Sequence, residues 1–108
     1  MNAKEEFLEL ALKLKPLCAN ILYLCWYSED IISIPPTDRR CILKCKYTEE
    51  EYNSFLESLD FEYSNGFGSQ NLYGTIWFEN GYWAERGEYD GSEWWVLRAY
   101  PTIPEELF

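Results

Sequence analysis

Four carboxylates, Glu85, Glu88, Asp90 and Glu93, lie close together in a stretch of the chain that is rich in tryptophan and tyrosine. Clustered carboxylates can hold a hard cation such as Ca²⁺ or Mg²⁺. A carboxylate pair beside aromatic rings can instead hydrolyse a glycosidic bond, with the rings as a platform for the sugar. The spacing does not follow that of a Ca²⁺-binding loop. We therefore favour a third interpretation, in which the carboxylates form the solvated rim of a hairpin.

The other residues that commonly carry chemistry are sparse. The chain has no histidine, which excludes His-based triads and proton relays and removes the commonest metal ligand. The four cysteines, Cys18, Cys25, Cys41 and Cys45, lack the tight Cys-x2-Cys spacing of structural zinc sites. Cys41 and Cys45 fall on the buried face of one predicted strand, and we expect all four to be small apolar thiols. The sequence thus predicts a non-enzymatic protein with no metal and no cofactor.

The charge is divided unevenly along the chain. Residues 1–47 carry a net charge of +1, whereas residues 48–108 carry −11, and the whole chain carries −10. Phosphate binding requires clustered Lys and Arg, so we expect no direct binding to nucleic acid or to an anionic membrane. A field of this sign does accelerate association with a basic protein surface. The alternative is that the charge only keeps the protein soluble and monomeric.

The length indicates a single domain over residues 1–108, because a chain of 108 residues can build one hydrophobic core but not two. No signal-peptide pattern follows the N-terminus, and the longest apolar run, Ile21–Tyr27, is too short to span a membrane. We therefore expect a cytoplasmic protein, a monomer or weak dimer, whose cysteines stay reduced.

Two amphipathic helices are expected to support a sheet. Asn2 can cap the first helix, with Glu5 as its capping-box partner, and Thr48 with Glu51 forms the same signature at the second. Short turns between the last three strands require antiparallel pairing. The predicted fold is α+β, in the order α-β-β-α-β-β-β, with a mainly antiparallel sheet and both helices packed on one face. The expected strands are Ile21–Tyr27, Cys41–Tyr47, Leu72–Phe78, Tyr82–Tyr89 and Glu93–Tyr100.

The turn at Asn80-Gly81 sets the predicted register of the last three strands. If these two residues form a two-residue type I′ turn, Phe78 faces Trp83. A straight turn at Asp90-Gly91 would place two glutamates opposite each other, so we expect a β-bulge there. One face of the sheet then carries Trp77, Tyr82, Trp95, Glu88 and Glu93, and the helices cover it only in part.

This acidic, aromatic hairpin face is the predicted contact surface. Tyr and Trp are favoured at the hot spots of interfaces, and an exposed apolar patch rimmed by charge marks an interaction site. The predicted partner-binding residues are Trp77, Tyr82, Glu85, Glu88, Asp90, Glu93 and Trp95.

The same segment carries a resemblance. Gly-Thr-Ile-Trp at 74–77 and Glu-Arg-Gly-Glu-Tyr-Asp-Gly-Ser-Glu-Trp-Trp at 85–95, with Pro101 and Ile103-Pro104 in the tail, resemble a family of small acidic phage and prophage proteins. No established catalytic residues come with this resemblance. It implies a protein that binds a host protein inside the bacterial cell. Some such proteins are anti-CRISPR or anti-restriction inhibitors that occupy a nucleic-acid channel.

Together these features predict a non-enzymatic phage or prophage protein that binds a basic host protein surface, in a defence complex or another nucleic-acid-binding complex. There it would act as a nucleic-acid mimic, because carboxylates can compete with phosphates for Lys and Arg. Two alternatives stay open. One is a small metal- or carbohydrate-binding enzyme that uses the four clustered carboxylates. The other is a phage accessory protein that self-associates through its aromatic face.

Overall fold

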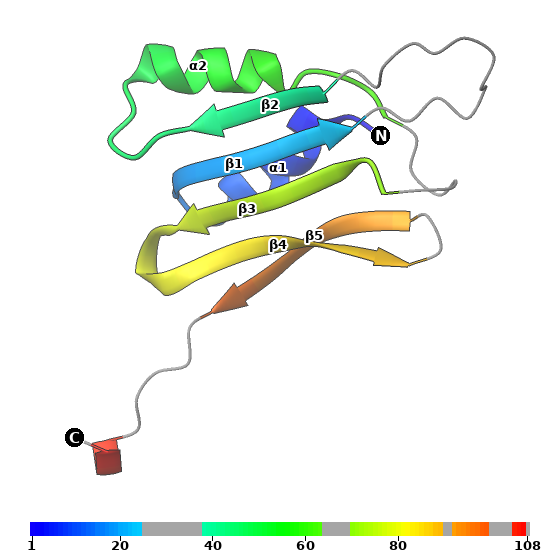
Figure 1. Ribbon diagram of the computed structural model, residues 1–108. Coiled ribbons are helices and arrows are strands. Elements are labelled where there is room, and N and C mark those ends of the chain that lie inside the picture. Colours follow the sequence, from blue (N-terminus) through cyan, green and yellow to red (C-terminus); the bar gives the residue numbers. More distant parts are fainter. Residues whose placement is uncertain (25–37, 64–69, 90–91, 100–104, 108) are drawn as a thin grey trace, which may run out of the picture.

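The computed structural model describes residues 1–24, 38–63, 70–89, 92–99 and 105–107, and all structural statements concern these residues. Two α-helices and five strands follow one another along the described chain, with short 3₁₀ turns at Glu79–Gly81 and Glu105–Leu107 (Figure 1). Leu72–Phe78 and Tyr82–Tyr89 have the predicted bounds. The elements are α1 (Ala3–Ala11), β1 (Pro16–Leu24), β2 (Asp38–Leu43), α2 (Glu49–Ser58), β3 (Leu72–Phe78), β4 (Tyr82–Tyr89) and β5 (Ser92–Ala99).

The five strands form one antiparallel sheet in the order β2-β1-β3-β4-β5. Ala3 and Phe7 of α1 and Phe55 of α2 belong to a single core together with buried side chains from one face of this sheet. Phe7 of α1 and Phe55 of α2 meet there with ring centroids 5.1 Å apart in an edge-to-face arrangement. The predicted α+β fold, with two helices on one face of an antiparallel sheet, is confirmed.

Both predicted helix starts are confirmed by their caps. The Asn2 side chain accepts a hydrogen bond from the Glu5 backbone N–H, and the Asn2 amide group donates to Asp60 and Glu62. At α2, Thr48 accepts from the Glu51 N–H while the Glu51 carboxylate accepts from the Thr48 N–H, which completes the capping box. Each helix therefore begins at the residue that its local capping signal predicts, with the reciprocal capping box formed at α2.

The first two strands differ from their predicted bounds. β1 begins at Pro16, because proline is tolerated as the first residue of a strand; the predicted end of this strand, residues 25–27, lies outside the described residues. β2 stops at Leu43, and Lys46 adopts a left-handed conformation with φ 61°. The chain thus turns before the helix instead of continuing the strand. As a result Cys45 is exposed, and its predicted burial is wrong.

The predicted register between β3 and β4 is wrong by one residue. Asn80 (φ 62°, ψ 27°) and Gly81 (φ 79°) do adopt the left-handed turn that Asn-Gly favours. However, Trp77 faces Trp83 and Ile76 faces Ala84. Glu79 forms a single short turn with Asn80 and Gly81, and its backbone N–H donates to the carbonyl of Lys15 just before β1, so the turn contains one residue more than predicted. Because side chains alternate with a period of two, this single residue moves every side chain of β4 and β5 to the face opposite the predicted one.

The described residues of β4 and β5 pair without a register shift. Tyr89 faces Ser92 and Glu88 faces Glu93, so the β-bulge predicted to separate these two glutamates is not formed. The sequence argument missed the compensation for their repulsion. Arg86, two residues before Glu88 on the same face, binds the Glu93 carboxylate with an Nη2–Oε1 distance of 2.6 Å.

Gly74 allows β1 and β3 to approach closely. It has φ +135°, and a Cβ atom at this position would lie 2.1 Å from the backbone oxygen of Asn20. Only glycine can occupy such a position without displacing one of the two central strands.

Candidate functional site

The sheet face opposite the helices, which we call the open face, carries a row of aromatic side chains. Trp77 and Trp83 face each other across β3 and β4, and Trp94 stands on the neighbouring strand β5. Trp77 keeps 39% of its surface exposed and Trp94 keeps 43%. No described helix lies over this face. Trp94 faces Gly87, four residues along β4 from Trp83, so the open face carries the Trp77–Trp83 pair and, further along the sheet, Trp94. Exposed tryptophans are favoured at the hot spots of interfaces.

Gly87 shapes the middle of the open face. It lies directly opposite Trp94, and a Cβ atom on Gly87 would fall 2.8 Å from the indole Nε1 of Trp94. The indole ring therefore rests against the strand where Gly87 has no side chain. Cγ2 of Val96 would also lie 2.9 Å from a Cβ on Gly87, so two β5 side chains rest against β4 at this glycine.

The described charges next to these rings are paired. Glu85 on β4 accepts a hydrogen bond from Arg98 Nε on β5 at 2.9 Å, and both side chains are partly exposed. The pair is neutral and lies at the surface, where such ion pairs contribute about 1 kcal/mol or less to stability. The aromatic part of the open face is therefore apolar, and its charge is locally balanced.

The structure divides the predicted contact residues between the two faces. Trp77 and Glu85 lie on the open face. Asp90 lies outside the described residues. Tyr82, Glu88, Glu93 and Trp95 lie on the helix-covered side of the sheet. The predicted single acidic and aromatic face is therefore not formed, because the one-residue register shift turns β4 and β5 over.

Sequence reasoning missed two aromatic residues that share the open face with Trp77. Trp83 and Trp94 were assigned to the opposite face, whereas Tyr73 was correctly expected on the same face as Trp77. The signal that could have found them is the strict alternation along β4 and β5. Once Trp77 is placed opposite Trp83, all later positions follow from the period of two.

Glu93 is a structural residue rather than a surface carboxylate. Its side chain is fully buried and accepts hydrogen bonds from the backbone N–H groups of Asn71 and Leu72 at 2.7 and 2.9 Å. On β3, only the residues from Thr75 to Trp77 pair with β4. The Glu93 carboxylate thus satisfies backbone donors at the start of β3, beyond the paired part of that ladder.

Arg86 connects this carboxylate to the helical layer. Its side chain is 2% exposed, and it donates to Glu93, to Glu6 of α1 and to the hydroxyl of Tyr63. Its guanidinium carbon lies 4.8 Å from the ring centroid of Trp95. Burial alone would lower the pKa of Arg86, but hydrogen bonding to Glu93 and the nearby negative charge of Glu6 raise it. Arg86 therefore stays charged.

Tyr63 closes the network by donating its hydroxyl to Glu6. Burial, with this hydrogen bond, raises the pKa of Tyr63 well above the usual range of a tyrosine. The four side chains join β4, β5, α1 and the segment after α2 into one buried ionic cluster. Each charge in the cluster has a partner, so the cluster has a structural role and connects the hairpin to the helices.

The clustered carboxylates do not assemble into a described cation site. Glu85 projects from the opposite side of β4 to Glu88, and Glu93 is neutralised by Arg86. Within the described part of the chain, no group of three or more His, Cys, Asp or Glu side chains is arranged to hold a metal ion.

Two thiols from different segments meet where β1 begins and the chain leaves β2. Burial, with a hydrogen bond and charge interaction from Cys45, raises the pKa of Cys18 to about 11. Cys18 is half-buried and Cys45 is exposed; both are free thiols. The raised pKa makes Cys18 unreactive at neutral pH, since the thiolate is the reactive form.

Exposed carboxylates gather on the helices instead of on the open face. Glu5 and Glu9 project from α1, and Glu49, Glu50 and Glu57 project from α2. The part of the negative charge that these residues carry therefore lies on the far side of the sheet from Trp77 and Trp94.

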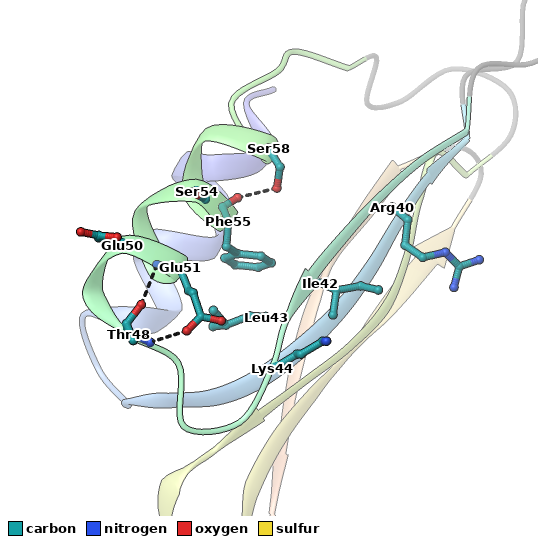
Figure 2. A pocket seen from close by; sticks show the side chains of 10 residues that line it. All are labelled: Arg40, Ile42, Leu43, Lys44, Thr48, Glu50, Glu51, Ser54, Phe55 and Ser58. Carbon is teal, nitrogen blue, oxygen red and sulfur yellow. Dashed lines mark hydrogen bonds between the residues drawn. The ribbon is translucent and has the colours of Figure 1, made fainter.

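A groove lies beside the first edge of the sheet, between β2 and α2 (Figure 2). Its volume is about 750 Å³. Phe55 lies between its walls, the strand side carries Arg40, Ile42 and Lys44, and the helix side carries Glu50 and Glu51 among others.

Searches of protein-family models, of curated proteins and of solved structures gave no match to this chain. None of the described helices is long and apolar enough to cross a membrane.

Proposed function

We propose that this chain is a non-enzymatic phage or prophage protein that binds a basic host protein, with the open face as its contact surface. The observation that carries the proposal is the presence of the exposed Trp77 and Trp94 and the half-buried Trp83 on a sheet face that no described helix covers. Indole rings lose little conformational entropy on binding and dominate the energetics of interfaces.

Charge and ring chemistry support a basic partner. The net charge of −10 attracts a cationic surface over a distance set by the Debye length, about 8 Å at physiological salt. At contact, the face of an exposed indole binds Lys and Arg by cation–π attraction, worth about 0.5–2 kcal/mol. The chain uses this contact internally, between Arg86 and Trp95. Steering and contact would thus come from different surfaces of the molecule.

A host defence nuclease or another nucleic-acid-binding complex is the partner class we propose. Such complexes expose lysine and arginine for phosphate binding. The protein would either cover this surface with its open face or fill it as a nucleic-acid mimic with the helix carboxylates. The two modes differ in which variants abolish binding.

The experiment compares two exposed aromatic residues on opposite faces. Trp77 and Tyr82 are 39% and 38% exposed, so they are matched in exposure but not in face. The tagged protein and the variants Trp77→Ala, Trp94→Ala and Tyr82→Ala are used to capture partners from bacterial lysate, and each partner identified by mass spectrometry is titrated in a salt series. We expect the two tryptophan variants to weaken binding roughly tenfold or more, and Tyr82→Ala to leave it nearly unchanged.

The contribution of charge is tested with the double variant Glu49→Lys/Glu57→Lys on α2. If the open face is the contact, this double variant slows association but leaves the dissociation rate nearly unchanged. A mimic that binds through the helices would instead dissociate faster. Equal capture by wild type and by Trp77→Ala/Trp94→Ala would contradict the open-face proposal.

A further inference from the structure

The groove between β2 and α2 runs along an unpaired strand. In the sheet order β2-β1-β3-β4-β5, β2 pairs with β1 on one side, and no described strand pairs with its other side. Alternate residues of an edge strand direct backbone N–H and C=O groups away from the sheet, where another extended chain can pair with them. Figure 2 shows α2 facing this strand across the groove. An added strand would therefore lie between the edge of β2 and the helix.

The two walls of the groove have opposite charge. Arg40 and Ile42 alternate along β2 and project toward the open face, and Lys44 directly after the strand lies beside Ile42 in Figure 2, so the wall on that side is cationic with an apolar centre. Glu50 and Glu51 of α2 form the other wall, and the apolar ring of Phe55 lies between them and the strand. Side chains directly opposite each other on paired strands interact, and opposite charges there are favourable.

We propose that this groove binds an extended peptide segment of a partner protein by strand addition to β2. The segment carries acidic side chains toward Arg40 and Lys44, an apolar side chain toward Ile42, and basic side chains on the alternate positions that face α2. Backbone pairing would supply affinity, and the two charged walls would supply register and specificity. This site is distinct from the open-face surface of the proposed function, since β2 and the tryptophan-bearing strand β5 are opposite edges of the sheet.

Charge argues against a second copy of this chain as the occupant. Pairing of β2 with β2 would place Arg40 and Lys44 of both copies on adjacent strands of the same face, where like charges are destabilising. Cations on an edge strand are a common protection against such self-pairing. A segment with acidic side chains at the matching positions removes this repulsion.

The test uses two synthetic peptides of identical composition. The core of the first is Glu-Lys-Val-Lys-Glu, and the core of the second is Lys-Glu-Val-Glu-Lys, each flanked by two threonines and capped at both ends. Neither peptide has a net charge, so the overall electrostatic field of the protein attracts both equally. Each core sequence is palindromic, so the side-chain order is the same for parallel and antiparallel pairing. We expect the first to bind about tenfold more tightly or better, because four charge pairs are reversed in the second. Equal binding, or a preference for the second peptide, overturns the proposal.

Variants of the protein test the walls. Arg40 and Glu50 are both exposed. Arg40→Glu and Glu50→Lys should each weaken binding of the first peptide, and the double variant should bind the second peptide more tightly. Glu57→Lys is the matched control, since Glu57 is an exposed α2 residue that does not line the groove. If Glu57→Lys weakens binding of the first peptide as much as Glu50→Lys does, specific binding in the groove is contradicted.

Backbone pairing is tested by N-methylation of the first peptide. Methylation of alternate amides removes donors from one edge of the peptide only. Strand addition predicts that one alternate set abolishes binding and the other leaves it intact, with chemical-shift changes in the protein at β2 and α2. If both methylated peptides bind like the parent, or if the shifts fall on β5, strand addition at this edge is wrong.

Discussion

Arg86 on β4 and Glu93 on β5 form a buried ion pair within the last hairpin. Through Arg86 to Glu6, and through Glu93 to the backbone N–H groups of Asn71 and Leu72, the pair also ties the hairpin to the rest of the fold. The side chains of Arg86 and Glu93 are 2% and 0% exposed, and the Nη2–Oε1 distance is 2.6 Å. Breaking a buried pair by removing one partner typically costs about 3–5 kcal/mol, since it leaves an uncompensated charge. The pair explains why two glutamates can face each other across β4 and β5.

We predict that Glu93→Gln lowers the free energy of unfolding by about 3 kcal/mol, and that Arg86→Met has a similar effect. The double variant should lose less than the sum of the two, because neither charge is then left alone. Urea denaturation measures all three. Glu85→Gln, which breaks the exposed pair with Arg98, is the control and should cost about 1 kcal/mol or less. A Glu93→Gln variant as stable as this control would contradict the structural role of the pair.

Two glycines should respond differently to a methyl group. Gly74→Ala combines a φ of +135° with a Cβ only 2.1 Å from the Asn20 backbone oxygen, so the strands must move apart. We predict a loss of about 3 kcal/mol or more, read from the urea midpoint.

Gly87→Ala is the comparison variant. Its Cβ would meet the partly exposed indole of Trp94, which can swing away from the sheet. We predict a loss of less than about 1 kcal/mol, together with greater quenching of tryptophan fluorescence by acrylamide. If both alanine variants lose equal stability, the close approach of β1 and β3 at Gly74 is not as described.

The thiol of Cys18 should be slow to react at ordinary pH. Its pKa of about 11 in the folded protein lies above the value of 9.0 of an unperturbed thiol. A pKa raised on folding means that the contribution of Cys18 to stability is fully present below about pH 9 and is lost as the pH rises toward 11. Peptide mapping after iodoacetamide treatment should show alkylation of Cys18 rising with a midpoint near pH 11. A midpoint near 9, as in a free thiol, would contradict the burial of this group beside Cys45.

The capping box of α2 gives a fourth prediction. Thr48→Ala removes the acceptor for the Glu51 N–H and should cost about 1 kcal/mol. Asn53→Ala, in the exposed interior of the same helix, should change stability by much less. Circular dichroism in a urea series distinguishes the two. Equal effects would mean that the cap contributes little beyond helix propensity.

The sequence by itself determined the elements of this protein. Capping residues such as Asn2 and Thr48 place the helix starts, and the Asn80-Gly81 pair places a left-handed turn, because these signals act within a few residues of the chain. Alternation and short turns were enough to predict an antiparallel sheet with two helices on one face. The predicted bounds of β1 and β2 were wrong. The strand start at Pro16 and the left-handed conformation of Lys46 depend on packing.

Tertiary structure alone decided which side chains share a face. The contact between Glu79 and Lys15, far apart in the sequence, adds one residue to the turn and reverses the facing of β4 and β5. Trp83 and Trp94 then join Trp77 on the open face, and Glu93 turns inward to Arg86. A strand has a period of two, so local sequence cannot distinguish the two registers, whereas the long-range backbone hydrogen bond and the buried ion pair can. The acidic and aromatic features that are mixed along the chain are thereby separated in space.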